Sequence, residues 1–580
     1  MTLLKVVLSL YTFFQVYDIT VHASVNRKKK IKNVYPAGFT ALMNEKLEQA
    51  LQNPIHSTFY SSTIADSSGR RVQEVNKTQQ IRIKFITTPL EKTLSESNDF
   101  NTKLRGEAVI SKILPHLAST FALALKVKPL QSIPIPKDSC FGFFEEYITD
   151  DMYLNGIIDS DVAIFISAFD NLGDTTLCRQ DPNMSTLAVS TPCNIEVSSN
   201  RPVIGLANIC LNSLALTSND TIDPGSLLVM EDVLTHEFIH IFGLNSVLYK
   251  YYRSAYDNSP LTPRRNTIFG FRNEFETKRF SCVNDKPDQI LEAVNENTLV
   301  FRTESVELYG GRRRNRGYYE IVLPTVTQVT RNQFNCQKLN GARLENQPTS
   351  EMECFGSHFD ERFFFTDIMS AVYDDDASYF SPLTLALLED TGWYISDFKR
   401  AENSPFGIGM GCDFVEKDCI DNGLVPTYSS GFFCNDYVNQ KTQCGPSHYF
   451  RGQCDLRFTF VPKRNYFPGE FIGPQFINAD YCPLIQLDSV DCDSVNASKI
   501  DPVETFDDDS RCMNVNLQDG SQTAVCIKAR CDVDTKQFIF NVGNITSSCG
   551  VSDEGKLIVL NHNKSEYTFF CPRLAQVCPE

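Results

Sequence analysis

The sequence predicts an α+β fold, with an N-terminal part built around one apolar helix and a disulfide-rich C-terminal module. The first observation is the order strand, helix, strand, strand, helix over residues 80–242. The second is the length of 580 residues, which exceeds one hydrophobic core and indicates about two to four domains. The third is the placement of 20 cysteines, of which none precedes Cys140 and thirteen follow position 411.

Three strands and one helical stretch are expected ahead of the apolar helix. Residues 80–86 alternate apolar and polar side chains, and residues 162–168 and 203–207 are short apolar runs, so each is expected to be a strand. Residues 105–127 carry apolar side chains at helical spacing, with Pro115 inside the stretch. Either two helices or one kinked helix is therefore expected there.

The apolar helix is expected to run from about Pro224 to Phe242. Asp223 is suited to cap its start, and a proline at the first helical position loses no hydrogen bond. Gly243 is suited to end it.

The chain after this helix is expected to be less regular. Residues 244–355 are interpreted as irregular and polar, and the basic cluster at 312–316 as an exposed, solvated loop, with a processing or binding site as the alternative. A helix is expected around Leu383 to Glu389, before the cysteine-rich region. The cysteines indicate disulfides formed in an oxidising compartment rather than zinc ribbons, because paired C-x-x-C motifs are absent.

The N-terminal residues are typical of export. Residues 1–23 are predicted to be a signal peptide, with Lys5 before an apolar run; a signal anchor is the alternative. Residues 24–75 are predicted to be a leader or propeptide, whose basic run at 27–30 and pair Arg70–Arg71 are either processing sites or solvated charges. No other stretch suggests a transmembrane segment, and the C-terminus lacks a GPI signal.

Charge and composition exclude two classes of function. The net charge of -17 and a pI of about 5.1 argue against nucleic-acid binding. The mean hydropathy of -0.22 argues against a polytopic membrane protein. A glycoprotein that is secreted, or extracellular and associated with the cell surface, is expected, with N-x-S/T sequons at Asn76, Asn183, Asn219, Asn496, Asn544 and Asn563.

The expected apolar helix carries the motif H-E-x-x-H-x-x-G from His236 to Gly243. Residues i and i+4 share one face of a helix, so His236 and His240 can both bind one Zn²⁺. Glu237 is placed to act as general base on a zinc-activated water. The alternative is a chance motif on an ordinary structural helix.

A third zinc ligand is needed. The compact metzincin pattern would require histidine at position 246, which is Ser246. Among the eight histidines, His358 remains as the candidate, and Met369 follows it as a methionine turn would.

These motifs resemble the leishmanolysin family, related to invadolysin. The similarity includes Gly356-Ser357-His358 followed by Met369, residues 159–167 and residues 379–394, and extends over about residues 80–578. The resemblance implies a zinc metalloendopeptidase of broad specificity acting on proteins or peptides, secreted or at a cell surface. It also implies a metzincin-type N-terminal catalytic subdomain (76–245), a central domain with the third ligand (246–395) and a cysteine-rich C-terminal domain (396–580).

Three departures from the family pattern stand out. The insertion at 244–357 is long, no cysteine precedes Cys140 to cap the zinc in a latent form, and no GPI signal is present. Two other functions remain open. One is a catalytically inactive adhesion or binding protein on the same scaffold, against which the retained Glu237 argues; the other is a disulfide-rich structural ectodomain with a chance motif.

Overall fold

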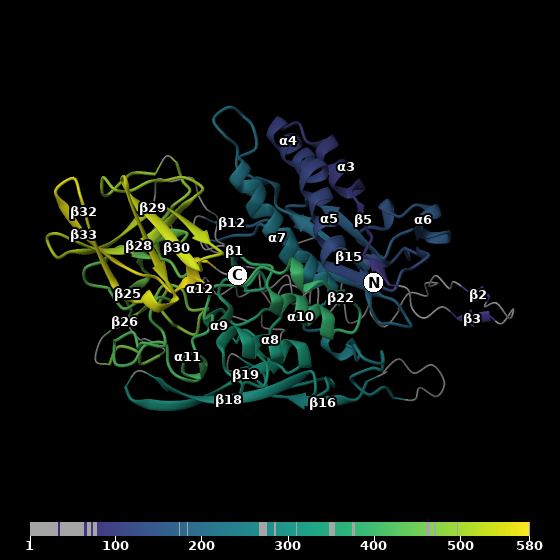
Figure 1. Ribbon diagram of the computed structural model, residues 1–580. Coiled ribbons are helices and arrows are strands. Elements are labelled where there is room, and N and C mark those ends of the chain that lie inside the picture. Colours follow the sequence, from purple (N-terminus) through teal and green to yellow (C-terminus); the bar gives the residue numbers. More distant parts are fainter. Residues whose placement is uncertain are drawn as a thin grey trace.

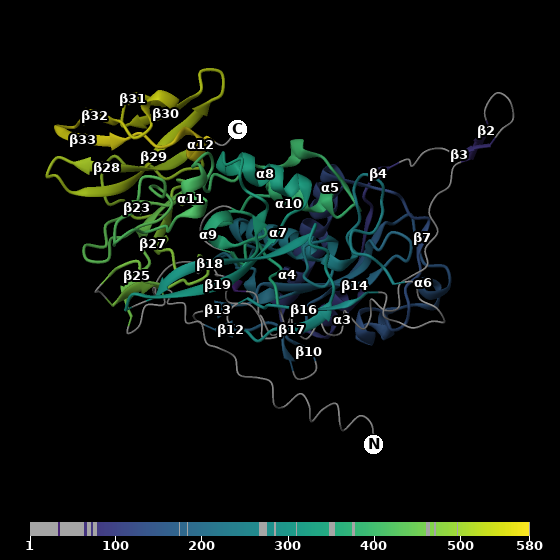
Figure 2. The same ribbon diagram turned by 90° about the horizontal axis from the view of Figure 1, so that it is seen from below.

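The computed structural model describes residues 78–578, apart from gaps at 173–174, 182–183, 266–274, 284–285, 309, 347–353, 374–377, 460–463, 469–470 and 496, and three short strands before residue 78. The N-terminal helices (blue) lie at one end of the molecule and the C-terminal sheet (yellow) at the other (Figure 1). The view from below shows the same separation (Figure 2). In this described part of the chain, no helix is both long and apolar enough to cross a membrane.

The predicted signal peptide, residues 1–23, lies outside the described residues. Of the predicted leader, residues 24–75, only the backbone strands β1 (Asn33–Val34), β2 (Thr63–Ala65) and β3 (Arg71–Gln73) are described. β2 and β3 pair with each other. β1 pairs with β13 (Met184–Ser185) and β21 (Val372–Tyr373). The signal peptide and the leader's role therefore stay predictions.

A four-stranded sheet, in the order β14-β15-β9-β5, forms the base of the N-terminal part. Strands β5 (Ile83–Ile86), β9 (Val162–Ser167) and β15 (Pro202–Ile209) are parallel. The edge strand β14 (Ala188–Ile195) is antiparallel to β15. Every residue of β9 and β15 is buried, which explains why both read as continuous apolar runs.

Two details differ from the sequence predictions. The strand expected at 80–86 is broken into β4 (Gln79–Gln80) and β5, because Arg82 between them turns its backbone and side chain to Asp161 at 3.0 and 2.9 Å. The stretch 105–127 ends in β6 (Leu125–Val127) and is two helices, α4 (Phe100–Ala108) and α5 (Leu114–Ala124), joined by a π-helical turn at Val109–Ile113. Pro115 falls in the first turn of α5, where a proline is tolerated.

Helix α7 (Pro224–Phe242) packs against β14 and β15, close to the predicted bounds. The side chain of Asp223 accepts a hydrogen bond from Ser226 N at 3.2 Å and caps its start. Gly205 on β15 lets the helix approach, since an added Cβ would lie 2.5 Å from Ile241. The second half of α7 is buried on all sides, so the apolar run of the sequence reflects a central helix.

The central region corrects the prediction of an irregular stretch at 244–355. It contains β16 (Thr277–Phe280), β17 (Gln289–Glu292), β18 (Leu299–Leu308), β19 (Arg312–Ile321), α8 (Pro324–Phe334) and β20 (Ala342–Arg343). β18 and β19 form a long hairpin. The basic cluster at 312–316 lies on strand β19 rather than in a loop, with Arg313 3.9 Å from Glu307. Because so many of its side chains are charged, the strand lacks the alternation of apolar and polar residues that would have predicted it. The short helix α9 (Glu361–Phe364) and α10 (Pro382–Asp390) follow, and α10 confirms the helix expected around 383–389.

The C-terminal region ends in an antiparallel six-stranded sheet, in the order β31-β30-β29-β28-β33-β32. Its strands are β28 (Ser510–Leu517), β29 (Gln522–Asp532), β30 (Gln537–Val542), β31 (Ile545–Gly550), β32 (Leu557–His562) and β33 (Ser565–Phe570). All 20 cysteines are paired in ten disulfides. The disulfide interpretation is confirmed, and zinc ribbons are excluded.

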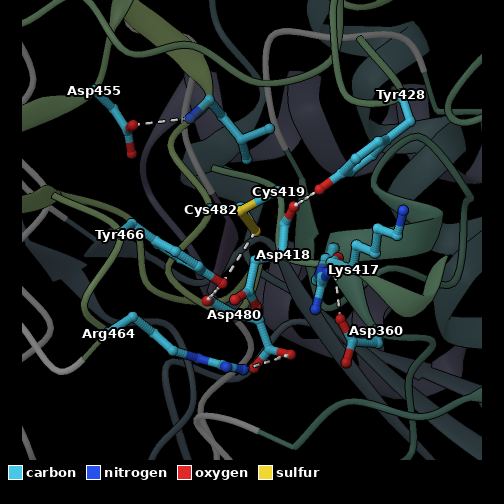
Figure 3. The surroundings of a disulfide bond; sticks show 12 residues. Asp360, Lys417, Asp418, Cys419, Tyr428, Asp455, Arg464, Tyr466, Asp480 and Cys482 are labelled. Carbon is cyan, nitrogen blue, oxygen red and sulfur yellow. Dashed lines mark hydrogen bonds and ion pairs between the residues drawn. A yellow bond between two sulfur atoms is a disulfide. The ribbon is translucent and has the colours of Figure 1, made fainter. Parts of the chain in front are cut away.

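A buried group of charges joins the central region to the C-terminal region. Asp480, whose side chain is fully buried, lies 2.7 Å from Arg343, and 3.5 Å from both Arg464 and Arg316. The disulfide Cys419–Cys482 lies beside this group (Figure 3). The ion pairs therefore connect β19 and β20 to a part of the chain more than 100 residues away.

Candidate metal centre

Three histidines from two separate segments meet in the core of the molecule. His236 and His240 lie one turn apart on α7, and His358 comes from the central region. The Nε2 atom of His240 is 2.9 Å from Nε2 of His236 and 3.1 Å from Nε2 of His358. The structure thus brings together the three ligands expected from the sequence.

The opposite nitrogen of each ring shows which tautomer is present. Nδ1 of His236 donates to the main-chain oxygen of Ile368 at 2.6 Å, and Nδ1 of His240 donates to that of Leu244 at 2.6 Å. Nδ1 of His358 donates to Oε1 of Glu345 at 2.7 Å. A neutral imidazole carries one N–H, so all three Nε2 atoms present lone pairs to the same point.

The electrostatics favour the neutral form of the two histidines on α7. Burial and the neighbouring histidines lower the pKa of His236 well below its usual value and that of His240 to about 3. Nitrogen lone pairs this close, at 2.9 Å and 3.1 Å from Nε2 of His240, repel one another unless a cation lies between them. A tetrahedral zinc ion with Zn–N distances of roughly 2.0–2.1 Å separates its nitrogen ligands by about 3.3 Å, so the donor set fits zinc.

A second group of possible metal ligands in the described residues does not form a site. It consists of Cys434, Cys454 and Asp455. The two cysteines form a disulfide and have no thiolate to offer.

His358 is held by an antiparallel contact between two short segments. Glu345 N donates to the main-chain oxygen of His358 at 3.0 Å, and Asp360 N donates to that of Arg343 at 3.0 Å. Leu344 and Phe359 form the bridge between them. This isolated bridge therefore holds His358 beside a helix that lies more than 100 residues earlier in the chain.

The predicted methionine turn lies next to this segment. Met369 is fully buried, and its main-chain oxygen accepts from Phe359 N at 3.0 Å. The carboxylate of Asp367 accepts from Met369 N at 2.8 Å and from Thr384 Oγ1 at 2.9 Å, which ties the turn to α10. The turn also supplies the Ile368 oxygen that orients His236.

Glu237 follows the first histidine and is only 1% exposed. Its Oε1 has no hydrogen-bond partner among the described residues. Ser190 on the edge strand β14 donates to the main-chain oxygen of Glu237 at 2.6 Å. Burial raises the pKa of Glu237 to about 7, against the opposing effect of the Ser190 hydroxyl.

Sequence reasoning missed Glu345, Asp367 and Ser190. Each makes at least one contact with a residue that is distant in the sequence, and none belongs to a periodic pattern. For Asp367, its position two residues before the expected methionine was the one available signal.

Comparison with known protein families matches residues 300–580 to leishmanolysin. A leishmanolysin-like peptidase of Caenorhabditis elegans is 25% identical over 378 residues, covering 61% of this chain and 53% of that protein. The Drosophila melanogaster leishmanolysin-like peptidase is 28% identical over 349 residues, covering 57% and 47%. Leishmanolysin of Leishmania donovani is 22% identical over 507 residues, covering 83% of this chain and 72% of that protein.

The chain spans about half the length of the leishmanolysin-like relatives it matches. The matched family region contains His358 and Met369, the two residues that the H-E-x-x-H motif alone did not supply. These matches show that the chain is similar to leishmanolysin over residues 300–580, with the paired histidines of α7 lying beside the matched region.

Proposed function

We propose that the chain is a secreted zinc-dependent metalloendopeptidase that hydrolyses peptide bonds of proteins or peptides. His236, His240 and His358 are its zinc ligands and Glu237 is its general base. One observation carries the proposal: three imidazoles, each held through Nδ1, bring their Nε2 atoms together beside a buried glutamate. The Caenorhabditis elegans and Drosophila melanogaster relatives are named peptidases, which supports the same reaction.

The proposed catalytic unit has a metzincin-type layout. Residues 76–245 supply the sheet, α7, two ligands and the base, while residues 246–395 supply His358 and the methionine turn. Residues 396–580 form the disulfide-rich C-terminal domain. The ion pairs of Asp480 support a fixed connection between the last two domains.

When bound, a zinc ion would lower the pKa of a coordinated water to about 7 and polarise the substrate carbonyl. The chain's own residues do the rest. Glu237 accepts the proton at its carboxylate and passes it to the leaving amine. Helix α7 fixes Glu237 relative to His236 and His240, and the Ser190 contact secures its backbone.

Secretion is supported by the ten disulfides, which persist in oxidising compartments. The sequons at Asn219, Asn544 and Asn563 are exposed, as glycosylation requires. The alternative is a catalytically inactive adhesion or binding protein on the same scaffold. The intact Glu237 favours the enzyme, because loss of the base would leave zinc binding without hydrolysis.

The test compares the wild type with Glu237→Gln, both purified from a secreting host with the leader removed. Glu231→Gln is the matched control, because it also removes a carboxylate from α7. The Glu231 carboxylate lies 3.0 Å from Nδ1 of His116 and not beside the three clustered histidines. Bound zinc is counted, and cleavage of a broad fluorogenic peptide library is measured. We expect one zinc per chain in all three proteins and an activity loss of at least about 10²-fold in Glu237→Gln alone.

Two results would count against the proposal. A wild type that holds zinc but cleaves no peptide in the library would favour the binding protein. Equal activity in Glu237→Gln and Glu231→Gln would remove Glu237 from the mechanism.

A further inference from the structure

We propose that Glu345 is the positioning residue of the third histidine, and that Gly356 and Ser357 form the cradle for its carboxylate. Glu345 fixes the ring orientation of His358 and keeps its proton on Nδ1, so that Nε2 faces the metal. The inference rests on the proposed function, because it concerns a ligand of the proposed zinc ion.

The carboxylate of Glu345 is buried and binds two neighbouring donors of one segment. Its Oε1 accepts from His358 Nδ1 at 2.7 Å and from Ser357 N at 3.0 Å. The Glu345 side chain is 6% exposed and that of His358 is 9% exposed. A charge-assisted hydrogen bond shielded from water in this way orients a metal-binding imidazole and makes it a stronger ligand.

Gly356 is required by the close approach of Glu345. A Cβ at this position would lie 2.3 Å from Cγ and 3.0 Å from Oε1 of Glu345, and 2.9 Å from its main-chain oxygen. No side chain fits without displacing the carboxylate. The glycine of the Gly356-Ser357-His358 sequence therefore makes room for the group that holds the histidine.

Ser357 also connects Glu345 to the segment that follows α7. Its backbone N–H binds Glu345, while its Oγ accepts from Ser246 N at 3.1 Å. Tyr249 Oη donates to the main-chain oxygen of Gly356 at 2.8 Å. Ser246 stands where a compact metzincin has its third histidine, so in this chain that position anchors the distant segment that carries His358.

The three ligands differ in how they are oriented. His236 and His240 donate to main-chain oxygens, which a substitution does not remove. His358 donates to a side chain, and the backbone of Glu345 also donates to the His358 oxygen at 3.0 Å. Glu345 is therefore the point at which ligand orientation can be changed without touching a ligand.

The test measures zinc affinity by competition with a chromophoric chelator, and the visible absorption spectrum of the Co²⁺-substituted protein. The variants are Glu345→Ala, Glu345→Gln and Gly356→Ala. Asp390→Asn is the matched control: this buried carboxylate accepts from Thr325 N at 2.7 Å and Val326 N at 2.9 Å, away from the histidines.

We expect Glu345→Ala to weaken zinc binding by about 10–100-fold and to alter the Co²⁺ spectrum. Glu345→Gln keeps an acceptor without the charge, so its loss should be smaller. Gly356→Ala should weaken zinc binding with Glu345 intact, and should add little in the Glu345→Ala background because both changes break one contact. Asp390→Asn should match the wild type.

Zinc affinities and Co²⁺ spectra that stay within twofold of the wild type in Glu345→Ala and Gly356→Ala would overturn the inference while leaving the peptidase proposal intact. A wild type that binds no zinc would overturn both. If Glu345→Ala does not fold, Glu345→Gln and Gly356→Ala decide the question by the same measurements.

Discussion

The carboxylate of Asp480 lies where arginines from the central and C-terminal regions meet, and replacing it with asparagine is expected to destabilise the junction. Arg343 approaches it at 2.7 Å and Arg316 at 3.5 Å. Arg464 also lies 3.5 Å away (Figure 3). The side chain of Asp480 is 0% exposed, and those of Arg343 and Arg464 are 8% and 4% exposed. Asparagine keeps the shape and removes the charge.

The expected loss of stability depends on which ion pairs the arginines keep when Asp480 is replaced. Removing one partner of a buried ion pair costs about 3–5 kcal/mol, because a buried charge is left uncompensated. Arg343 and Arg464 keep contacts with Glu304 at 3.1 and 2.9 Å, so we expect the lower end, about 3 kcal/mol. For an unfolding unit of 150–250 residues this corresponds to roughly 6–12 °C in Tm.

The assay is thermal unfolding of Asp480→Asn beside a control that breaks an ion pair of equal length at the surface. Asp413 and Lys417 are 2.7 Å apart, but their side chains are 53% and 55% exposed. Asp413→Asn should leave Tm unchanged within error, because exposed pairs contribute little. Equal Tm values for the two variants would refute the claim that burial increases the contribution of the Asp480 ion pairs to stability.

The pH dependence gives a second check on the same residue. Burial alone would raise the pKa of Asp480, but Arg343, Arg464 and Arg316 hold it well below its usual value of 3.8. Because the folded-state pKa is depressed, the carboxylate stabilises the fold above about pH 4, and this contribution is lost as the pH falls further. The Tm difference between wild type and Asp480→Asn should therefore shrink on acidification below about pH 4.

Three further perturbations test the fold around the site. Gly205→Ala should lower the free energy of unfolding by about 1–3 kcal/mol, because the added Cβ pushes α7 away from the sheet. The loss should be smaller when Ile241 is also replaced by alanine, and an equal loss in both backgrounds would contradict a direct contact between Gly205 and Ile241. A zinc chelator should lower Tm reversibly, since free zinc at 1,000 times its Kd stabilises by about 4.1 kcal/mol; an unchanged Tm would mean no bound metal. Replacing Cys336 and Cys412 by serine removes a disulfide that joins residues 76 positions apart, and should lower the free energy of unfolding by about 4 kcal/mol. Urea unfolding measures this loss, and an unchanged midpoint would contradict the prediction.

The predictable parts of this protein are those with local causes. Helix α7 begins at the Asp223 cap and Pro224, as its sequence indicates, and the buried strands beneath it read as apolar runs. Helical spacing alone places His236 and His240, two of the three clustered histidines, on one face of α7. His358 and Met369 could be placed by their order in the chain, because metal-ligand chemistry leaves few candidates among eight histidines.

The parts that escaped prediction depend on contacts between distant residues. β14 contains serine, threonine, proline and asparagine, so its pairing with β15 has no apolar signature. The hairpin of β18 and β19 was obscured by charged residues that pair across strands or with Asp480. Glu345 becomes part of the site only because Gly356 leaves it room.

The central claim is that His236, His240 and His358 bind one zinc ion through nitrogen. X-ray absorption at the zinc edge of the purified protein tests it most directly, because the method reports the type and distance of the bound atoms. The account predicts one zinc per chain with three nitrogen ligands at roughly 2.0–2.1 Å, and loss of that signal in His358→Ala. Zinc bound through sulfur at about 2.3 Å, or an unchanged spectrum in His358→Ala, would contradict it.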